Sequence, residues 1–159
     1  MIIFIDADGT LLNDEKHVPK SAAEAIQSAR QNGHRAYLCT GRTREDIFEE
    51  IENVGFDGFI CDNGALIESD GKVIFDETES EKKFEKSFAI RFLLDRFKID
   101  PSDTIAIGDS KYDLPMFEVC KINIAMGNGK DEIKSAATFV TDSVDKDGIL
   151  HAFQRLNLI

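Results

Sequence analysis

The sequence predicts an α/β protein: a doubly wound, parallel, Rossmann-like sheet between two layers of helices. Short apolar runs recur along the chain, which is typical of strands buried on both faces of a parallel sheet. Segments with helical periodicity separate these runs, and repeated strand–helix units favour parallel strands joined by right-handed crossovers. Because the 159 residues contain no linker-like or repetitive stretch, we expect one domain over residues 1–159.

The first half of the chain is predicted to hold three strands, two helices and a hairpin. The first strand, Ile2–Asp6, is followed by Pro19 at a helix start and by an Ala-rich helix, Ser21–Asn32, that stops at Gly33. The later elements are a strand at Arg35–Cys39, a helix with Thr43 as N-cap that ends at Gly55, a strand at Phe59–Cys61 and a hairpin at Ala65–Phe75 with an Asp70-Gly71 turn.

The second half returns to alternating helices and strands after a polar stretch, Asp76–Lys83. Its first helix, about Phe84–Phe97, carries a stripe of Phe84, Phe88 and Phe92 that we expect to be core; if a covering domain was lost, part of the stripe would be exposed and could drive self-association. The elements that follow are a strand at Thr104–Ile107, a helix at Asp113–Val119, a strand at Ile122–Ala125, a short helix after Lys130, a strand at Phe139–Val140 and a helix at Asp147–Leu156.

The charge of the chain excludes some partners. A formal net charge of −11 and a pI near 4.7 argue against nucleic acid and against anionic membrane surfaces, which both need Lys and Arg. The three Cys residues show no zinc-binding spacing, and no apolar run approaches the length of a membrane span. We therefore expect a cytoplasmic protein that acts on a small substrate.

Polar residues that can perform chemistry cluster at predicted strand ends and helix starts. In an open α/β sheet, ligands bind at the carboxyl ends of the strands. Paired acids at such an end repel each other unless a cation lies between them. The clusters are Asp6 and Asp8, then Thr40-Gly41-Arg42, then Lys86, and then Gly108-Asp109 with Asp113.

These residue types suit phosphoryl transfer. One carboxylate can attack phosphorus, a second can protonate the leaving oxygen, and a third can help to hold a divalent cation. Mg²⁺ is the cation that suits such oxygen ligands. Thr40 and the N–H of Gly41 can bind phosphate oxygens, while Lys86 can neutralise charge that grows in the transition state.

The same residues resemble the four signatures of the haloacid dehalogenase superfamily, in order. The matching segments are Asp6-Ala7-Asp8-Gly9-Thr10, Leu38-Cys39-Thr40-Gly41-Arg42, Lys86-Ser87-Phe88-Ala89-Ile90 and Ile107-Gly108-Asp109-Ser110-Lys111-Tyr112-Asp113. Two further segments, Asp62-Asn63-Gly64-Ala65 and Ala125-Met126-Gly127-Asn128-Gly129, are similar to the Cof-type branch, which mostly hydrolyses sugar phosphates and other small phosphate esters.

The resemblance implies roles for these residues. Asp6 would be the nucleophile that forms an aspartyl-phosphate, and Asp8 the general acid and then base. Mg²⁺ would be held by the Asp6 carboxylate, the Asp8 backbone carbonyl and Asp109, with Asp113 close behind. Thr40, Gly41 and Lys86 would bind the phosphoryl group. Arg42, Asn63 and Asn128 are further candidates for the substrate side, although Arg42 could equally be a solvated charge and the two Asn residues could stabilise turns.

Two departures from the family pattern stand out. Tyr112 replaces the usual Asn of the fourth signature, and the cap domain expected near residues 76–83 is missing. A natural capless protein and an engineered deletion both fit. Without a cap we expect weak, unselective activity, or a homo-oligomer in which a neighbouring subunit covers the open site.

Two other functions compete with the phosphatase. A receiver-like signalling domain would be phosphorylated on Asp62 after the third strand, and a degenerate scaffold would bind Mg²⁺ without turnover. Receivers place two adjacent acids after strand one. In this chain Asp6 and Asp8 are separated by one residue, so the order of the acids favours the phosphatase.

Overall fold

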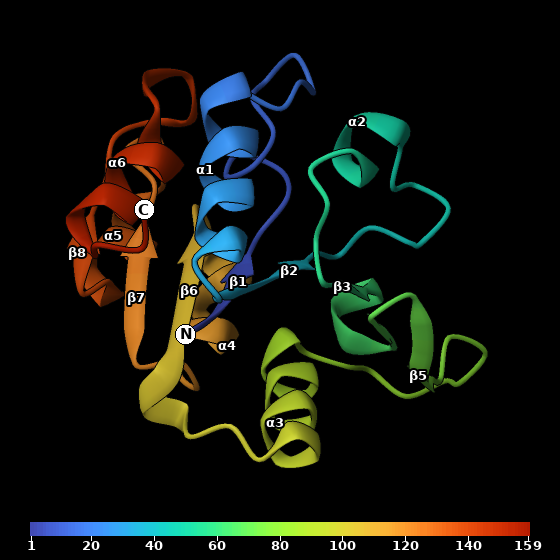
Figure 1. Ribbon diagram of the computed structural model, residues 1–159. Coiled ribbons are helices and arrows are strands. Elements are labelled where there is room, and N and C mark those ends of the chain that lie inside the picture. Colours follow the sequence, from blue (N-terminus) through green and yellow to red (C-terminus); the bar gives the residue numbers. More distant parts are fainter.

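The computed structural model describes residues 1–159 and contains one eight-stranded sheet in the order β5-β4-β3-β2-β1-β6-β7-β8 (Figure 1). Six neighbouring strands run parallel: β3, β2, β1, β6, β7 and β8. At one edge β4 is antiparallel to β3, and β5 is antiparallel to β4. The strands are β1 (Ile2–Ile5), β2 (Arg35–Cys39), β3 (Gly58–Cys61), β4 (Leu66–Ser69), β5 (Lys72–Asp76), β6 (Thr104–Gly108), β7 (Ile122–Ala125) and β8 (Phe139–Val140).

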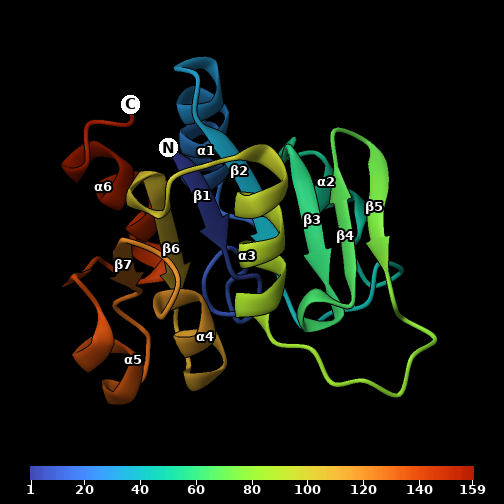
Figure 2. The same ribbon diagram turned by 90° about the horizontal axis from the view of Figure 1, so that it is seen from below.

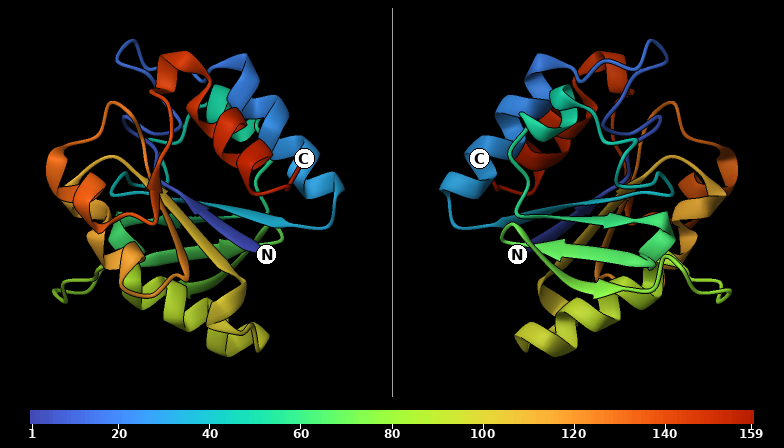
Figure 3. Two further views of the ribbon diagram at one scale, coloured as in Figure 1. Left: turned by 90° about the vertical axis from the view of Figure 1, so that its left-hand side faces the viewer. Right: turned by 90° about the vertical axis from the view of Figure 1, so that its right-hand side faces the viewer.

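Helices cover both faces of this sheet. Side chains alternate along β1, so Ile3 and Ile5 enter one apolar cluster while Ile2 and Phe4 enter the other. Figure 3 shows α1 and α6 packed together on one face and α3 on the opposite face. The predicted three-layer fold is therefore confirmed. The helices are α1 (Lys20–Gln31), α2 (Glu49–Glu52), α3 (Lys86–Phe97), α4 (Leu114–Phe117), α5 (Asp131–Ala136) and α6 (Gly148–Arg155).

The predicted hairpin forms the antiparallel edge. Asp70 and Gly71 both have positive φ values, 51° and 72°, as a tight two-residue hairpin turn requires. Figure 2 shows β3, β4 and β5 side by side, with a loop from β5 to α3 that contains no inserted domain. The polar stretch 76–83 thus begins at the last residue of β5 and otherwise lies in a connection rather than in a cap.

Several helices differ from their predicted extents, α3 among them because it begins at Lys86 and not at Phe84, and in two of them a local cause is visible. Thr43 does not cap a helix, because its hydroxyl donates to Asp46 in a local turn (2.9 Å) and α2 begins only after Phe48. Asp113 lies in a 3-10 turn, Lys111–Asp113, and α4 begins after it at Leu114. In both places short-range side-chain bonds favour a turn over a first helical turn.

The predicted Phe stripe is only partly core, since Phe92 packs against the apolar cluster that contains Ile2 and Phe4. Phe84 and Phe92 are half-buried and Phe88 is 37% exposed. They form an aromatic cluster with Phe75 of β5, in which neighbouring ring centroids lie 5.2 to 6.3 Å apart. Because β5 is the last strand at its edge, nothing beyond it covers these rings. None of the helices combines the length and apolar character that a membrane-spanning segment needs.

Candidate active site

Three central strands deliver the predicted catalytic residues to one edge of the sheet. Ile5 of β1 pairs with Leu38 of β2 and with Ile107 of β6, so the carboxyl ends of these strands are level. The residues that follow, including Asp6 and Thr40, therefore lie side by side. The structure brings together acids that are far apart in the sequence.

A buried ammonium group joins two of these acids. Lys86, the first residue of α3, is 3% exposed, and its Nζ donates to Oδ1 of Asp6 and to Oδ1 of Asp113, at 2.6 Å each. The second oxygen of Asp113 accepts the backbone N–H groups of Asp109 (3.0 Å) and Ser110 (3.1 Å). Both oxygens of Asp113 are thus engaged within the protein, whereas Lys86 contacts only one oxygen of Asp6.

The cluster contains more negative than positive charge. Ligand atoms of Asp6, Asp109 and Asp113 lie within 4.8 Å of one another, and Lys86 is the ammonium that contacts the cluster. Burial raises the pKa of Asp6, and burial together with the charge of Asp113 raises the pKa of Asp109 to about 6. The pKa of Lys86 is raised despite its burial, because Asp6 and Asp113 hold its proton. A divalent cation with oxygen ligands would balance this charge.

Asp8 points to a different set of cations. Arg42 binds it through two parallel hydrogen bonds, Nε to Oδ2 at 2.8 Å and Nη2 to Oδ1 at 2.9 Å, and Lys16 adds a third at 2.7 Å. The Arg42 bonds hold the pKa of Asp8 well below its usual range. Arg42 is therefore not a freely solvated charge, and Asp8 is held as an anion.

The loop after β2, the strand next to β1, forms another wall of the site. Thr40 is 2% exposed, and its Oγ1 accepts the N–H of Arg42 at 3.1 Å. Gly41 lies against Asn63, whose backbone N–H donates to the carbonyl of Thr40 at 3.1 Å. Asn63 has a φ of 55°, so it turns the chain beside this loop.

These walls enclose an open hollow of about 350 Å³. Asp109 and Asp113 do not line it but lie beside its acidic end. Two lining residues, Ser110 and Tyr112, had no predicted site role. The predicted residues that line it are Asp6, Asp8, Thr40, Gly41, Arg42, Asn63 and Lys86.

Asn128 lies outside this hollow and is used to hold the backbone. Its side-chain amide donates to the carbonyl of Gly9 at 2.7 Å, and its Oδ1 accepts the N–H of Val144 at 2.9 Å. The residue thus ties the turn after Asp8 to the chain before α6. Of the two readings that the sequence left open for Asn128, the geometry favours turn stabilisation.

Sequence reasoning missed two residues that shape the site. Lys16 binds Asp8 from a polar loop, where no motif singles it out. Gly9 has a φ of 82°, and a side chain there would overlap the carboxylate of Asp109. Its place in the first signature could have indicated this close approach.

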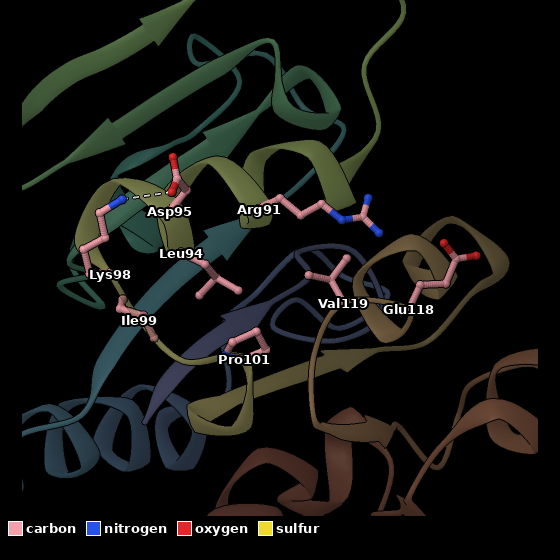
Figure 4. Close-up of a pocket in the computed structure, with 8 residues that line it drawn as sticks. All are labelled: Arg91, Leu94, Asp95, Lys98, Ile99, Pro101, Glu118 and Val119. Atoms are coloured by element: carbon pink, nitrogen blue, oxygen red, sulfur yellow. Dashed lines mark hydrogen bonds and ion pairs between the residues drawn. The ribbon is translucent and has the colours of Figure 1, made fainter.

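A separate hollow of about 520 Å³ lies between α3 and α4 (Figure 4). Figure 4 shows Arg91 and Leu94 from α3 on one side and Val119 on the other. Nearby, Lys98 forms an exposed ion pair with Asp95 at 3.0 Å. None of the predicted site residues lines this hollow, so its chemistry is unrelated to the acidic cluster.

Comparison with known proteins indicates the family of this chain. The family model for haloacid dehalogenase-like hydrolases matches residues 3–88 and 79–153. YkrA of Bacillus subtilis (strain 168), provisionally named a phosphatase, is 23% identical over 252 aligned positions that cover 99% of this chain and 98% of YkrA. Because 252 positions exceed the 159 residues of this chain, YkrA contains residues with no counterpart here.

A shorter match and a solved structure agree with this result. The 5-amino-6-(5-phospho-D-ribitylamino)uracil phosphatase YwtE of Bacillus subtilis (strain 168) is 45% identical over 71 residues, which cover 45% of this chain and 25% of YwtE. The structure of the subclass IIB sugar phosphatase BT4131 superposes with a TM-score of 0.87, at 21% identity and 99% coverage of both chains. The predicted enzyme class, a phosphatase, agrees with these relatives. The match over most of its length places this chain in the haloacid dehalogenase-like hydrolase family.

Proposed function

We propose that this protein hydrolyses small phosphate monoesters, with Asp6 as nucleophile and Mg²⁺ as cofactor. The observation that carries the proposal is the position of Asp6. It is buried at the end of the central strand, bound by Lys86 through one oxygen, and it lines the same hollow as Thr40 and Gly41. A carboxylate so placed can meet a phosphoryl group held by the neighbouring loop.

The donor set fits Mg²⁺. Carboxylate oxygens of Asp6 and Asp109 are hard ligands, and the cluster lacks positive charge. Asp113 is better placed to position Lys86 and the Asp109 backbone than to bind an ion, because both its oxygens are engaged. The ion would be held by Asp6, Asp109 and the backbone carbonyl of Asp8, and would supply neutralisation of the phosphoryl oxygens.

Two displacements make up the reaction. An oxygen of Asp6 attacks phosphorus, a P–O bond forms to Asp6, and the bond from phosphorus to the leaving oxygen breaks. The leaving oxygen takes a proton from Asp8. In the second step Asp8 takes a proton from water, whose oxygen attacks the phosphorus and releases phosphate and free Asp6. Thr40, the Gly41 N–H and Lys86 stabilise the charge on the phosphoryl oxygens.

Asp8 must be released from its cations before it can act as an acid. Arg42 and Lys16 favour the anion, which cannot donate a proton. Arg42 also lines the hollow, so a phosphate dianion there competes with Asp8 for the guanidinium. Substrate binding would thereby free the Asp8 carboxylate to take up a proton from solvent, and Asp8 would then pass that proton to the leaving oxygen.

The missing cap bears on the substrate. The two matched pieces of the family model overlap over residues 79–88, which include most of the segment 76–83. A cap normally closes over a small substrate and excludes water. Its absence supports weak turnover of several small esters, sugar phosphates among them, unless a second subunit covers the hollow.

Hydrolysis of p-nitrophenyl phosphate tests this proposal. Activity should require Mg²⁺ and vanish with EDTA, and Asp6→Asn should abolish it because the nucleophile is lost. Asp14→Asn is the matched control, since Asp14 is an exposed carboxylate in the following loop. Equal turnover in Asp6→Asn and Asp14→Asn would refute the mechanism.

The receiver-like alternative finds less support. Lys86 binds Asp6 and Asp113, and Asp62 lines a different hollow together with Lys82 and Lys83. A stable phosphoryl group on Asp62 without turnover would restore that alternative. Binding of Mg²⁺ without hydrolysis of any phosphate ester would favour the inactive scaffold.

A further inference from the structure

A second groove continues from the proposed phosphoryl site. It measures about 410 Å³, within the range of small-molecule sites. Three of its lining residues, Asn63, Lys86 and Tyr112, also line the hollow that contains Asp6. A substrate whose phosphoryl group meets Asp6 can therefore extend its leaving group into this groove.

Part of the groove's wall is aromatic and apolar, among polar and charged lining residues. Phe84 forms part of one wall, and its ring is fixed by Phe75 and Phe88, at centroid distances of 5.7 and 5.2 Å. Leu114 and Pro115, both half-buried, add apolar surface from the start of α4. These side chains are held in place without a ligand, which reduces the entropic cost of binding one.

Tyr112 is the residue that joins the two hollows. Its side chain is 70% exposed, and the ammonium of Lys111 lies 5.3 Å from its ring centroid. A large aromatic ring exposed at the mouth of a site is an available stacking surface. The charged lining residues have both signs, Glu85 and Glu132 against Lys111 and the buried, paired Lys86, so the groove does not select strongly for a charged leaving group.

We propose that this groove binds the leaving group of the substrate and favours a flat aromatic ring. The inference rests on the proposed function and adds a substrate class to it. Tyr112 and Phe84 then provide the selectivity for the leaving group. An aromatic pair contributes about 0.5–1.5 kcal/mol, which corresponds to a preference of roughly 2- to 12-fold.

Two aryl phosphates test the groove with little change in chemistry. Phenyl phosphate and 2-naphthyl phosphate have leaving groups of similar acidity but different ring area. We expect the naphthyl ester to have the higher kcat/KM, by the factor above. Tyr112→Ser and Phe84→Leu should each reduce that ratio toward one, while Tyr112→Phe should keep it. Val140→Ser, which removes an exposed apolar residue outside the groove, is the control and should keep the ratio.

Binding separates this inference from the proposed function. In Asp6→Asn, dissociation constants for the two esters can be measured without turnover. Tighter binding of 2-naphthyl phosphate, lost in a second substitution of Tyr112→Ser, supports the groove even if no ester is hydrolysed. Equal dissociation constants, or a kcat/KM ratio that Tyr112→Ser leaves unchanged, would overturn the inference while leaving the role of Asp6 intact.

Discussion

Replacing Lys86 with Met should destabilise the protein strongly. The Lys86 ammonium is buried, and Met is an apolar side chain of similar length, so the main loss is charge rather than volume. Without it, Asp6 and Asp113 would face each other with no cation between them. Removing one partner of a buried ion pair costs about 3–5 kcal/mol.

The size of this effect can be read from thermal unfolding. For a chain of this length, each kcal/mol shifts Tm by about 2–4 °C, so the expected fall is roughly 6–20 °C. Circular dichroism in EDTA would measure it, and Lys83→Met is the control because Lys83 is exposed. Added Mg²⁺ should recover part of the loss in Lys86→Met, since the ion replaces missing positive charge.

The loss of stability in Lys86→Met should also depend on pH, and it should grow as pH rises. Burial already raises the pKa of Asp6 in the folded protein, and loss of the ammonium would raise that pKa further. Between the pKa of Asp6 in the unfolded chain and its higher pKa in the folded protein, the folded state keeps a proton that the unfolded state has released. Stability therefore falls as pH rises through this range. We expect a larger deficit at pH 8 than at pH 5. The reasoning fails if Lys86→Met and Lys83→Met unfold at the same temperature, or if the deficit grows as pH falls.

Three further substitutions test other parts of the structure. Thr40→Ala should lower kcat/KM by roughly 10- to 100-fold, since one hydrogen bond to a charged group contributes about 1.5–3 kcal/mol; a loss as complete as that of Asp6→Asn would contradict this ranking. Gly9→Ala should reduce turnover sharply, because the added methyl group overlaps the Asp109 carboxylate, and steady-state kinetics with and without excess Mg²⁺ would show it. Asp57→Asn should destabilise the protein at neutral pH: burial opposes ionisation of Asp57, but Arg30, at 2.7 and 2.9 Å, outweighs it and lowers the pKa of Asp57. The stability that ionised Asp57 contributes is present above its pKa in the unfolded chain and is lost as pH falls through its pKa in the folded protein. The free energies of unfolding in urea of Asp57→Asn and wild type should therefore converge in acid. A difference between them that widens in acid would refute this reasoning.

The strands could be predicted closely because their sequence signals are local. Arg35–Cys39 and Ile122–Ala125 have the predicted bounds, since most residues of each strand are apolar and polar residues, Thr40 and Lys121, adjoin them. The helix expected from Thr43 was wrong over most of its length. The apolar spacing from Ile47 to Val54 fits a helix, but Ile47 and Val54 are buried from turns on either side of α2.

The site could be predicted in its members but not in its pairings. The four signatures indicate Asp6, Thr40 and Asp109, because strand ends gather at one edge. No local pattern shows that Arg42 and Lys16 both bind Asp8, since that pairing depends on two loops meeting in three dimensions. Helical periodicity likewise indicates which face of α3 carries the Phe residues, but not that only an edge strand lies opposite them.

The place of β1 in the sheet determines when the acidic cluster can form. Ile2 pairs with Arg35 on one side and with Thr104 on the other, so the second neighbour of this strand comes from a distant part of the chain. Closing so long a loop is slow and is entropically costly until the strand pairs. A growing chain that ends before Thr104 also lacks Asp109 and Asp113. The protein therefore does not bring Asp109 and Asp113 close to Asp6 until β6, the strand that precedes them, completes the middle of the sheet.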